Sequence, residues 1–507
     1  MISQHSLRQL ICKLSLQLSS KSHRLSPQCQ SGFFTYHQQF IHRRLFSTEA
    51  SSSQILANGG EIDDKARPMV NWMDACKKIC WLRNSKLGAE SVLNRFQRGE
   101  KKLTRRELRR LINELSKYKR YRSALEVSEW MNSRNKGRHL TTTDIAVQLG
   151  LIAKVRGISA AEGFFQTIPE QSKDGRVYGE LLSCYAQSKM VENAESLIET
   201  MKKKRNFTEA YPFNVIMTHY MNLKQYDKVE AMIAEMIKKN VRLDLYTYNI
   251  WLTSCGSHGS AEKMEQVFER MQHEKGIIPN WTTFCNLATM YIKFGEIEKA
   301  NDRLKKAESR IRGRDRMPYH YLLTLYGRCR NKEEVFRVWN TYKAAFSRIP
   351  SVAYHSIMSS LLRIGDVEGA EQINEEWRLT KPKCDIRIPN LLIGFYAKQG
   401  DMENAERILK QITDMGGKPS SYTWEILAEG HIVSRKPREA FSYLEKSFAG
   451  DLRRWKLKQQ TYSSFIALCE EESELVCKDG LLDLCRNAGY SYGSYLDGEG
   501  SPCLDTD

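Results

Sequence analysis

Long hydrophobic runs are missing from this chain of 507 residues. No stretch approaches the ~20 apolar residues that a membrane-spanning helix needs, so the sequence predicts no membrane span. Paired metal-ligand motifs are missing as well: the chain has neither Cys-x-x-Cys nor His-x-Glu, which a zinc-dependent deaminase requires. It has no glycine-rich phosphate loop and no nucleophile–base spacing typical of catalysis. These absences predict a protein with no catalytic activity of its own and no cofactor.

Two cysteine pairs at the spacing of metal ligands are also lacking, although the chain has thirteen cysteines in all. Cys76 and Cys80 are one helical turn apart, but no second pair of ligands accompanies them. The others are scattered along the chain. We therefore expect structural thiols in a reducing compartment and no metal site.

Acidic residues are absent from the first 48 positions, and the first acid is Glu49. The same segment holds six Arg and Lys residues, many serines and an amphipathic start, which is typical of a transit peptide. Arg44, three residues before Ser47, resembles a matrix-protease site. We predict a mitochondrial transit peptide over residues 1–46 and a location in the mitochondrial matrix. A chloroplast peptide and a basic disordered tail are the alternatives. Removal of the segment lowers the formal charge from +18 to +12, which is consistent with a polyanionic partner.

Three segments share an apolar run, then a cation, then Gly-x-x-x-x-Ala. Their glycines are Gly295, Gly365 and Gly400, so the spacings are two periods and one period of 35 residues. A fixed period of this length is typical of stacked helical repeats. Two units depart from the period, with one extra residue in 245–280 and three in 421–458. The units start at Arg105, Leu140, Gly175, Ala210, Leu245, Trp281, Arg316, Ser351, Ile386, Ser421 and Gln459.

Two columns of this register support it at positions that did not define it. The twentieth residue of each unit is small or apolar, as expected where two helices pack closely: Ala124, Ser159, Ala194, Val229, Met264, Ala300, Val335, Ala370, Ala405 and Ala440. The eleventh residue is tyrosine in five units: Tyr185, Tyr220, Tyr291, Tyr326 and Tyr396. Each unit is predicted to form two helices, the first ending at a glycine such as Gly259 that can adopt the left-handed conformation. One pair cannot bury its apolar face alone, so neighbouring units are expected to stack.

An Asn after an aromatic residue near the start of a 35-residue helical hairpin resembles the pentatricopeptide repeat family. The closest matches are residues 246–250, Tyr-Thr-Tyr-Asn-Ile, and 213–216, Phe-Asn-Val-Ile. The Trp-x-x-Leu-Gly-x-x-Tyr pattern of tetratricopeptide repeats, which bind peptides, is absent. The resemblance covers residues 105 to about 490 and points to the pure-repeat P subfamily of plant organelles. It implies an all-α, right-handed superhelical solenoid of about ten helix-turn-helix repeats.

The remaining segments complete the predicted organisation. Thr104 and Glu107 form a capping-box signature at the start of the array. A last helix is expected after Gly480. The predicted parts are a flexible linker over 47–70, an N-terminal helical cap over 71–104, the repeat array over 105–458, a C-terminal partial repeat or cap over 459–490, and a disordered tail over 491–507.

The resemblance implies that the fifth and last residues of each unit contact one RNA base together, while the second residue flanks it. Three pairs begin with Asn and imply uridine, either pyrimidine and cytidine, respectively: Asn214 with Asp244, Asn249 with Asn280, and Asn390 with Ser420. Stacking on a flanking tyrosine contributes about 1–3 kcal/mol, and the flanking tyrosines are Tyr211, Tyr246 and Tyr422. Ordinary helix-start chemistry is the alternative explanation of the asparagines.

Five other pairs match no strong family combination: Asp144/Asp174, Gly179/Glu209, Cys285/Asp315, His320/Pro350 and His355/Asp385. For the two histidines a purely structural role is the favoured interpretation. These pairs leave the RNA sequence that the chain would select undefined.

The thirteenth residue is a cation in five units: Lys117, Lys293, Arg328, Arg363 and Lys398. In the family this position reaches the phosphate backbone. Five such contacts on single-stranded RNA give a salt slope of roughly −3.5, at about −0.7 per phosphate. Solvated cations that interact with the helix dipole are the alternative.

Two functions fit these features. The first is a single-stranded RNA-binding protein of the mitochondrion that acts in RNA processing, stability or translation. The second is a structural component of the mitochondrial ribosome, or a protein-binding scaffold, which the unmatched pairs favour. The sequence leaves the oligomeric state open.

Overall fold

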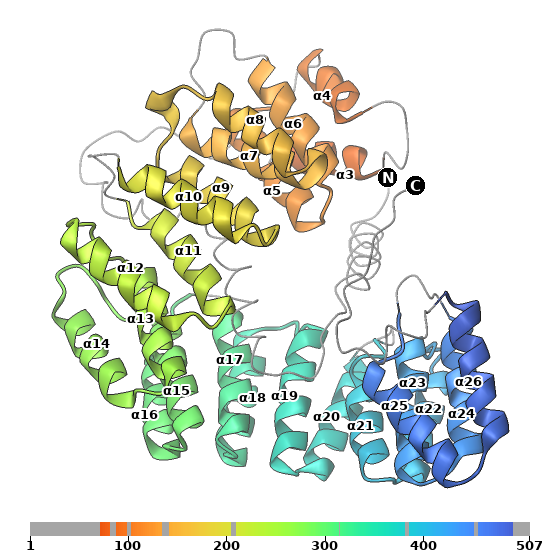
Figure 1. Ribbon diagram of the computed structural model, residues 1–507. Coiled ribbons are helices and arrows are strands. Elements are labelled where there is room, and N and C mark those ends of the chain that lie inside the picture. The colour runs from red at the N-terminus through yellow and green to blue at the C-terminus, as the bar shows by residue number, and fades with distance from the viewer. Residues whose placement is uncertain are drawn as a thin grey trace. The chain divides into compact units, whose positions relative to one another are not determined.

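The computed structural model describes residues 71–81, 88–98, 103–133, 141–203, 209–313, 315–380, 385–450 and 455–489. The predicted transit peptide, the linker and the tail beyond residue 490 lie outside the described residues. Within the described ranges the chain forms 24 α-helices and one short 3-10 helix, and no strand. None of these helices is both long enough and apolar enough to span a bilayer. The chain divides into two compact units at Ile278 and Pro279, and each is described by itself (Figure 1).

The first unit is a succession of helix pairs joined by short turns. Its helices are α3 Asn71–Trp81, α4 Ala89–Arg98, α5 Arg105–Lys117, α6 Tyr121–Ser133, α7 Thr142–Arg156, α8 Ile158–Thr167, η1 Glu170–Ser172, α9 Gly175–Gln187, α10 Val191–Lys202, α11 Tyr211–Asn222, α12 Tyr226–Lys238, α13 Leu245–His258 and α14 Ala261–His273. The odd-numbered helices α7, α9, α11 and α13 pack successively against one another.

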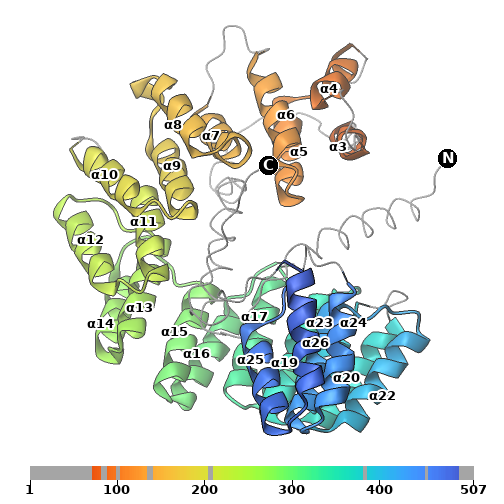
Figure 2. The same ribbon diagram turned by 45° about the vertical axis from the view of Figure 1, so that its right-hand side comes forward.

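The second unit repeats this arrangement, with its pairs side by side (Figure 2). Its helices are α15 Trp281–Phe294, α16 Ile297–Ser309, α17 Met317–Arg328, α18 Lys332–Ala345, α19 Ser351–Ile364, α20 Val367–Thr380, α21 Pro389–Lys398, α22 Met402–Asp414, α23 Ser421–Val433, α24 Pro437–Phe448, α25 Gln459–Glu471 and α26 Leu475–Asn487. Here the odd-numbered helices again pack successively from α15 to α25.

The predicted all-α stack of helical hairpins is confirmed. Every predicted unit start lies at the first residue of an odd-numbered helix or within three residues before it. The twentieth residues explain the close packing within hairpins, because nine of the ten have no exposed surface: Ala124, Ala194, Val229, Met264, Ala300, Val335, Ala370, Ala405 and Ala440. The capping box of α5 is also present, since the Thr104 backbone N–H donates to Glu107 at 2.8 Å.

The predicted register is wrong in the unit that contains α7. Ser159, its predicted twentieth residue, is exposed, whereas Ala161 is fully buried. Thr141 is the N-cap of α7, the position that Asp174 holds before α9. The unit therefore starts at residue 142, and the preceding unit spans residues 105–141, two more than the period. The added length precedes α7, where no repeated glycine marks the change.

The turn between the two helices of each repeat contains a residue with positive φ. At the fifteenth position this residue is a glycine in four repeats, for example Gly259 with φ of 100°. Five repeats have a cation in its place: Lys119, Lys189, Lys224, Arg330 and Arg435, with φ between 56° and 59°. The left-handed conformation costs a residue with a Cβ atom roughly 1–2 kcal/mol. These five turns therefore keep their cations against a backbone preference.

The tyrosine column joins neighbouring repeats. Four tyrosines on odd-numbered helices each donate a hydrogen bond to a glutamate on the second helix of the preceding repeat: Tyr185 to Glu162 at 2.8 Å, Tyr220 to Glu195 at 3.0 Å, Tyr326 to Glu308 at 2.6 Å and Tyr396 to Glu371 at 2.9 Å. Burial and the bond to Glu371 raise the pKa of Tyr396 to about 12. The recurrence of tyrosine at the eleventh position thus reflects a repeated interface bond.

Both ends of the array carry a further helix pair. At the N-terminal end, α3 packs against α5 and α4 against α6. At the C-terminal end, α25 and α26 pack against α23 and α24. The helix expected after Gly480 begins earlier, at Leu475, with Gly480 in its interior. This glycine marks a close approach rather than a helix start, because a Cβ there would lie 2.4 Å from the Phe441 ring.

Candidate nucleic-acid interface

The predicted base-reading residues lie near the N-terminal ends of the odd-numbered helices. In α11, Asn214 Nδ2 donates to Asp244 Oδ1 at 3.0 Å, and Thr247 Oγ1 donates to Asn214 Oδ1 at 2.9 Å. Asp244 is the N-cap of α13 and accepts from the Thr247 backbone N–H at 2.8 Å. The amide of Asn214 is therefore oriented from both ends by the first turn of the next repeat.

Asn249 and Asn390 occupy the fifth position of two other repeats and are 4% and 7% exposed. Neither amide oxygen accepts a hydrogen bond from a described residue. Ser420, the predicted partner of Asn390, caps α23 together with Thr423, and no hydrogen bond between described residues joins it to Asn390. Asn280, the predicted partner of Asn249, caps α15 in the other compact unit. The pairing of Asn249 with Asn280 stays a prediction.

The three flanking tyrosines differ in their surroundings. Tyr422 is 47% exposed, with the Lys458 ammonium 5.0 Å from its ring centroid. Tyr246 is half-buried. Tyr211 packs against Gly179, where a Cβ would lie only 2.1 Å from the tyrosine ring. The Tyr211 ring thus takes the space of the fifth side chain of the preceding repeat, which explains why the Gly179/Glu209 pair matches no base-reading combination.

The cations of the thirteenth column lie at the C-terminal ends of the odd-numbered helices. Lys293, Arg363 and Lys398 are exposed, and Arg328 is half-buried. Lys117 is exposed and forms an ion pair with Glu114 one turn earlier. The corrected register adds Lys154, which is also exposed. Sequence reasoning missed Lys154 because the two-residue shift hid its position.

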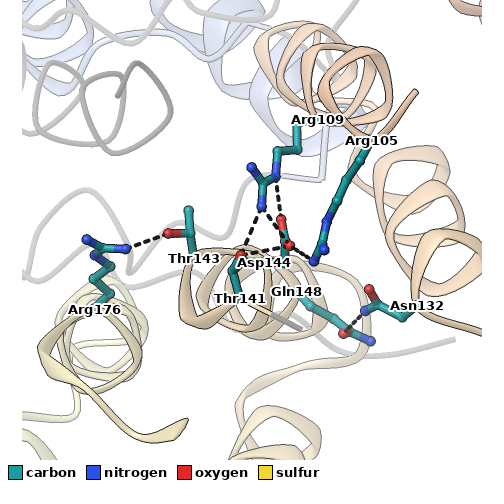
Figure 3. A network of polar contacts seen from close by, with 8 residues as sticks. All are labelled: Arg105, Arg109, Asn132, Thr141, Thr143, Asp144, Gln148 and Arg176. Carbon is teal, nitrogen blue, oxygen red and sulfur yellow. Dashed lines mark hydrogen bonds and ion pairs between the residues drawn. The ribbon is translucent and has the colours of Figure 1, made fainter. Parts of the chain in front are cut away.

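The first repeat of the array has a closed polar network in place of a free fifth residue (Figure 3). Its fifth and last residues are Arg109 and Thr141, and Arg109 donates to Thr141 Oγ1 at 2.9 Å and to Asp144 Oδ1 at 2.7 Å. Arg105 also pairs with Asp144. Burial alone would raise the pKa of Asp144, but hydrogen bonds from Arg109, Thr141 and Arg105 hold it below its ordinary value. The prediction that Asp144 is a fifth residue is wrong. Asp144 anchors the first turn of α7, and Ala146 is the fifth residue of this repeat.

A second closed network occupies the last full repeat. Glu425, its fifth residue, is 1% exposed and accepts from Trp455 Nε1 at 2.9 Å, from the Lys458 backbone N–H at 3.0 Å and from Thr461 Oγ1 at 3.2 Å. Burial raises the pKa of Glu425 above its ordinary value. Lys458 is the last residue of this unit, so the fifth and last residues are bound to each other and to the following helix. Both terminal repeats have their base-reading positions filled by protein groups.

The two histidines at fifth positions are not equivalent. His320 Nε2 lies 3.1 Å from the Tyr342 hydroxyl, and burial together with Arg316 lowers the pKa of His320 to about 4. His355 is exposed. Cys285, the fifth residue of α15, is buried. Among the described residues, no three His, Cys, Asp or Glu side chains are grouped so as to hold a metal ion.

Similarity to known proteins assigns the family. A pentatricopeptide repeat-containing protein of Arabidopsis thaliana is 52% identical over 431 residues, which cover 85% of this chain and 82% of that protein. The chain belongs to the pentatricopeptide repeat family. The model of the PPR repeat family matches residues 210–257, and that of the PPR repeat matches 176–206, 246–275 and 388–417. These matches begin within two residues of the predicted unit starts.

Two further relatives of this pentatricopeptide repeat protein are also from Arabidopsis thaliana. The large ribosomal subunit protein mL101 is 36% identical over 407 residues, which cover 80% of this chain and 82% of that protein. A pentatricopeptide repeat-containing protein named as mitochondrial is 33% identical over 392 residues, which cover 77% of this chain and 80% of that protein.

Proposed function

We propose that this pentatricopeptide repeat protein binds single-stranded RNA in the mitochondrion and acts through binding, without catalysis, in RNA processing, stability or translation. The observation that carries the proposal is the Asn214 amide. Asp244 accepts from one of its two N–H groups, and Thr247 donates to its oxygen, so the second N–H and a second lone pair remain available. One donor and one acceptor held in fixed orientation match the Watson–Crick edge of a pyrimidine.

Asn249 and Asn390 support the same function. A buried acceptor without a hydrogen bond costs about 1–3 kcal/mol of stability. Two such amide oxygens at the same repeat position therefore favour a bound hydrogen-bond donor. Rotation about the Cβ–Cγ bond exchanges the two ends of an amide and turns the oxygen outward. The N3–H group of uracil beside Asn249, or the N4 amino group of cytosine beside either asparagine, is a donor that would satisfy it.

The proposed mitochondrial location rests on two observations. Residues 1–46 have the composition of a transit peptide, and a 33% identical relative is named as mitochondrial. The absence of any zinc-deaminase motif from the sequence supports assignment to the pure-repeat P subfamily.

A binding assay tests the proposal. Fluorescence anisotropy with labelled 30-nucleotide uridine and adenosine strands should show tighter binding of uridine. Asn214→Ala and Asn249→Ala should weaken uridine binding by about 1–3 kcal/mol each, the cost of unpaired buried polar groups. Gln272→Ala is the control, because Gln272 is exposed on α14, the second helix of the Asn249 hairpin. Equal losses on both strands would contradict base reading, and the same loss in the control would contradict a role of the fifth residue.

A component of the mitochondrial ribosome is the second candidate, and the similarity to mL101 favours it. The closed networks at Asp144 and Glu425 fit this role too, since those repeats have no free base-reading side chain. Sedimentation of mitochondrial lysate on a sucrose gradient separates the two. Co-migration with the large subunit at high salt supports the ribosomal role, and absence from every ribosomal fraction at low salt rejects it.

A further inference from the structure

A second set of cations lies two residues beyond the thirteenth column, in the turn that follows each odd-numbered helix. The fifteenth residue is Lys119, Lys189, Lys224, Arg330 or Arg435 in five repeats, and each adopts a left-handed backbone conformation. Glycine holds the same position in four other repeats, where it has no Cβ penalty. Because glycine is the favoured residue at this point of a helix end, the cations are not explained by the turn itself.

Cations at the thirteenth and fifteenth positions together occur in nearly every repeat. Where the thirteenth residue is uncharged, as with Gln187 and Asn222, the fifteenth is Lys189 or Lys224. Where the fifteenth residue is a glycine, as with Gly295, the thirteenth is usually a cation, here Lys293. With Lys154 and Arg156 in the corrected register, every repeat from 105 to 458 except repeat 245–280 has a cation at one or both positions. Three repeats have both: Lys117 with Lys119, Lys154 with Arg156, and Arg328 with Arg330. A helix-dipole effect does not require a cation at the fifteenth position in the repeats whose thirteenth residue is uncharged.

The turn cations also differ from other lysines in their ion pairs. Lys119, Lys189, Lys224 and Arg330 are exposed, and none of them pairs with an acidic group of the described chain. By contrast, Lys228, Lys239 and Lys263, on or at the end of second helices, pair with Glu195, Glu235 and Glu230. Arg435 is the exception among the turn cations, because it pairs with Glu471 and Glu472 in the terminal repeat whose fifth position is also closed.

The arrangement of the helices places these cations in a line within each unit. From α7 to α13 and from α15 to α25, successive odd-numbered helices pack side by side in the same direction, so equivalent turns follow one another at the helix spacing of about 8–10 Å. At least one cation then accompanies the base of each repeat except repeat 245–280. We propose that Lys189 and Lys224 in the first unit, and Arg330 in the second, are phosphate-binding residues of a second row that continues the thirteenth column within each unit. This inference rests on the proposed RNA-binding function.

Salt dependence of binding tests the second row. The full chain and its Lys189→Gly, Lys224→Gly double variant are titrated with a labelled 30-nucleotide uridine strand between 50 and 300 mM salt. Glycine suits the left-handed turn, so the variant folds with a urea midpoint equal to or above that of the parent chain. Loss of two phosphate contacts should make the salt slope shallower by about 1.4 and weaken binding by roughly fivefold per contact at 0.1 M salt.

Lys238→Gln is the matched control, because Lys238 is exposed at the end of the second helix of the Lys224 hairpin. The salt slope of Lys238→Gln should equal that of the parent chain. An equally reduced slope in this control would mean that net charge alone explains the effect, and the proposed second row would be wrong. If the parent chain binds and the double variant keeps its slope, the second row is wrong and the proposed function stands. If the parent chain fails to bind at 50 mM salt, both are wrong.

Discussion

The amide of Asn214 and the carboxylate of Asp244 are 30 positions apart in sequence and share a hydrogen bond of 3.0 Å. This bond joins the fifth residue of one repeat to the residue that caps the first helix of the next. Asp244 therefore has two tasks: it starts α13, and it orients the Asn214 amide. A change that preserves the first task isolates the second.

Asp244→Ser should change base preference at one RNA position without loss of stability. Serine is an N-cap residue as good as aspartate, so α13 keeps its start. The family pairing of Asn with Ser implies cytidine where Asn with Asp implies uridine. Sequencing of strands selected from a randomised RNA pool measures the preference, and Ser420→Asp provides the reverse exchange. Unchanged preferences in both variants would show that the last residue does not orient the base-reading amide.

The repeat period, the helix pairs and nine of the ten twentieth-position contacts were predictable, because a stacked repeat imposes the same burial at the same position every time. The register near α7 was not, since the two added residues precede Thr141 in a stretch without a repeated marker. The tyrosine column was visible in the sequence, but its bonds to glutamates were not. Glu162, Glu195 and Glu371 share the twenty-first position only in the corrected register, and Glu308 holds the twenty-eighth.

The site was predictable only where a single repeat defines it. The pairing of Asn214 with Asp244 follows from the family pattern, whereas the filling of a fifth position by a neighbour does not. Tyr211 covers Gly179, and Trp455 covers Glu425, through contacts between repeats that depend on the packed structure. The left-handed cations also escaped prediction, since glycine is the residue that signals such a turn.

Asp144→Asn should destabilise the first repeats by about 3 kcal/mol. The substitution leaves Arg105 and Arg109 without their buried counter-charge, and removal of one partner of a buried ion pair costs about 3–5 kcal/mol; the partial exposure of both arginines favours the lower end. Hydrogen exchange of the α5 and α7 amides measures the loss locally. Asp174→Asn is the control, since asparagine caps α9 as well as aspartate does. Equal protection in Asp144→Asn and the parent chain would contradict a stabilising network.

Tyr220→Phe should weaken the interface between the repeats of α9 and α11 by about 1 kcal/mol. The substitution removes the hydroxyl that donates to Glu195 and keeps the ring, and a hydrogen bond contributes about 0.5–1.5 kcal/mol net. Urea unfolding followed by circular dichroism measures the change. Tyr226→Phe is the matched control, because its hydroxyl has no hydrogen bond to a described residue. If both variants unfold at the same urea concentration as the parent chain, the tyrosine column does not hold the repeats together.

His320 should make the second unit less stable as the pH falls from about 6.5 to about 4. Burial and Arg316 lower its folded pKa to about 4, while Asp315 opposes that shift. Between these pH values the unfolded chain binds a proton that the folded chain does not, so acidification favours unfolding. The full shift corresponds to about 3 kcal/mol, at 1.36 kcal/mol per pKa unit. Urea unfolding at pH 7 and pH 4.5 should show a smaller pH effect in His320→Gln than in the parent chain. His355→Gln, which changes an exposed histidine, should keep the parent's pH effect. Identical pH effects in all three proteins would mean that His320 binds a proton as readily in the folded chain as in the unfolded chain. Burial beside Tyr342 would then not lower its pKa.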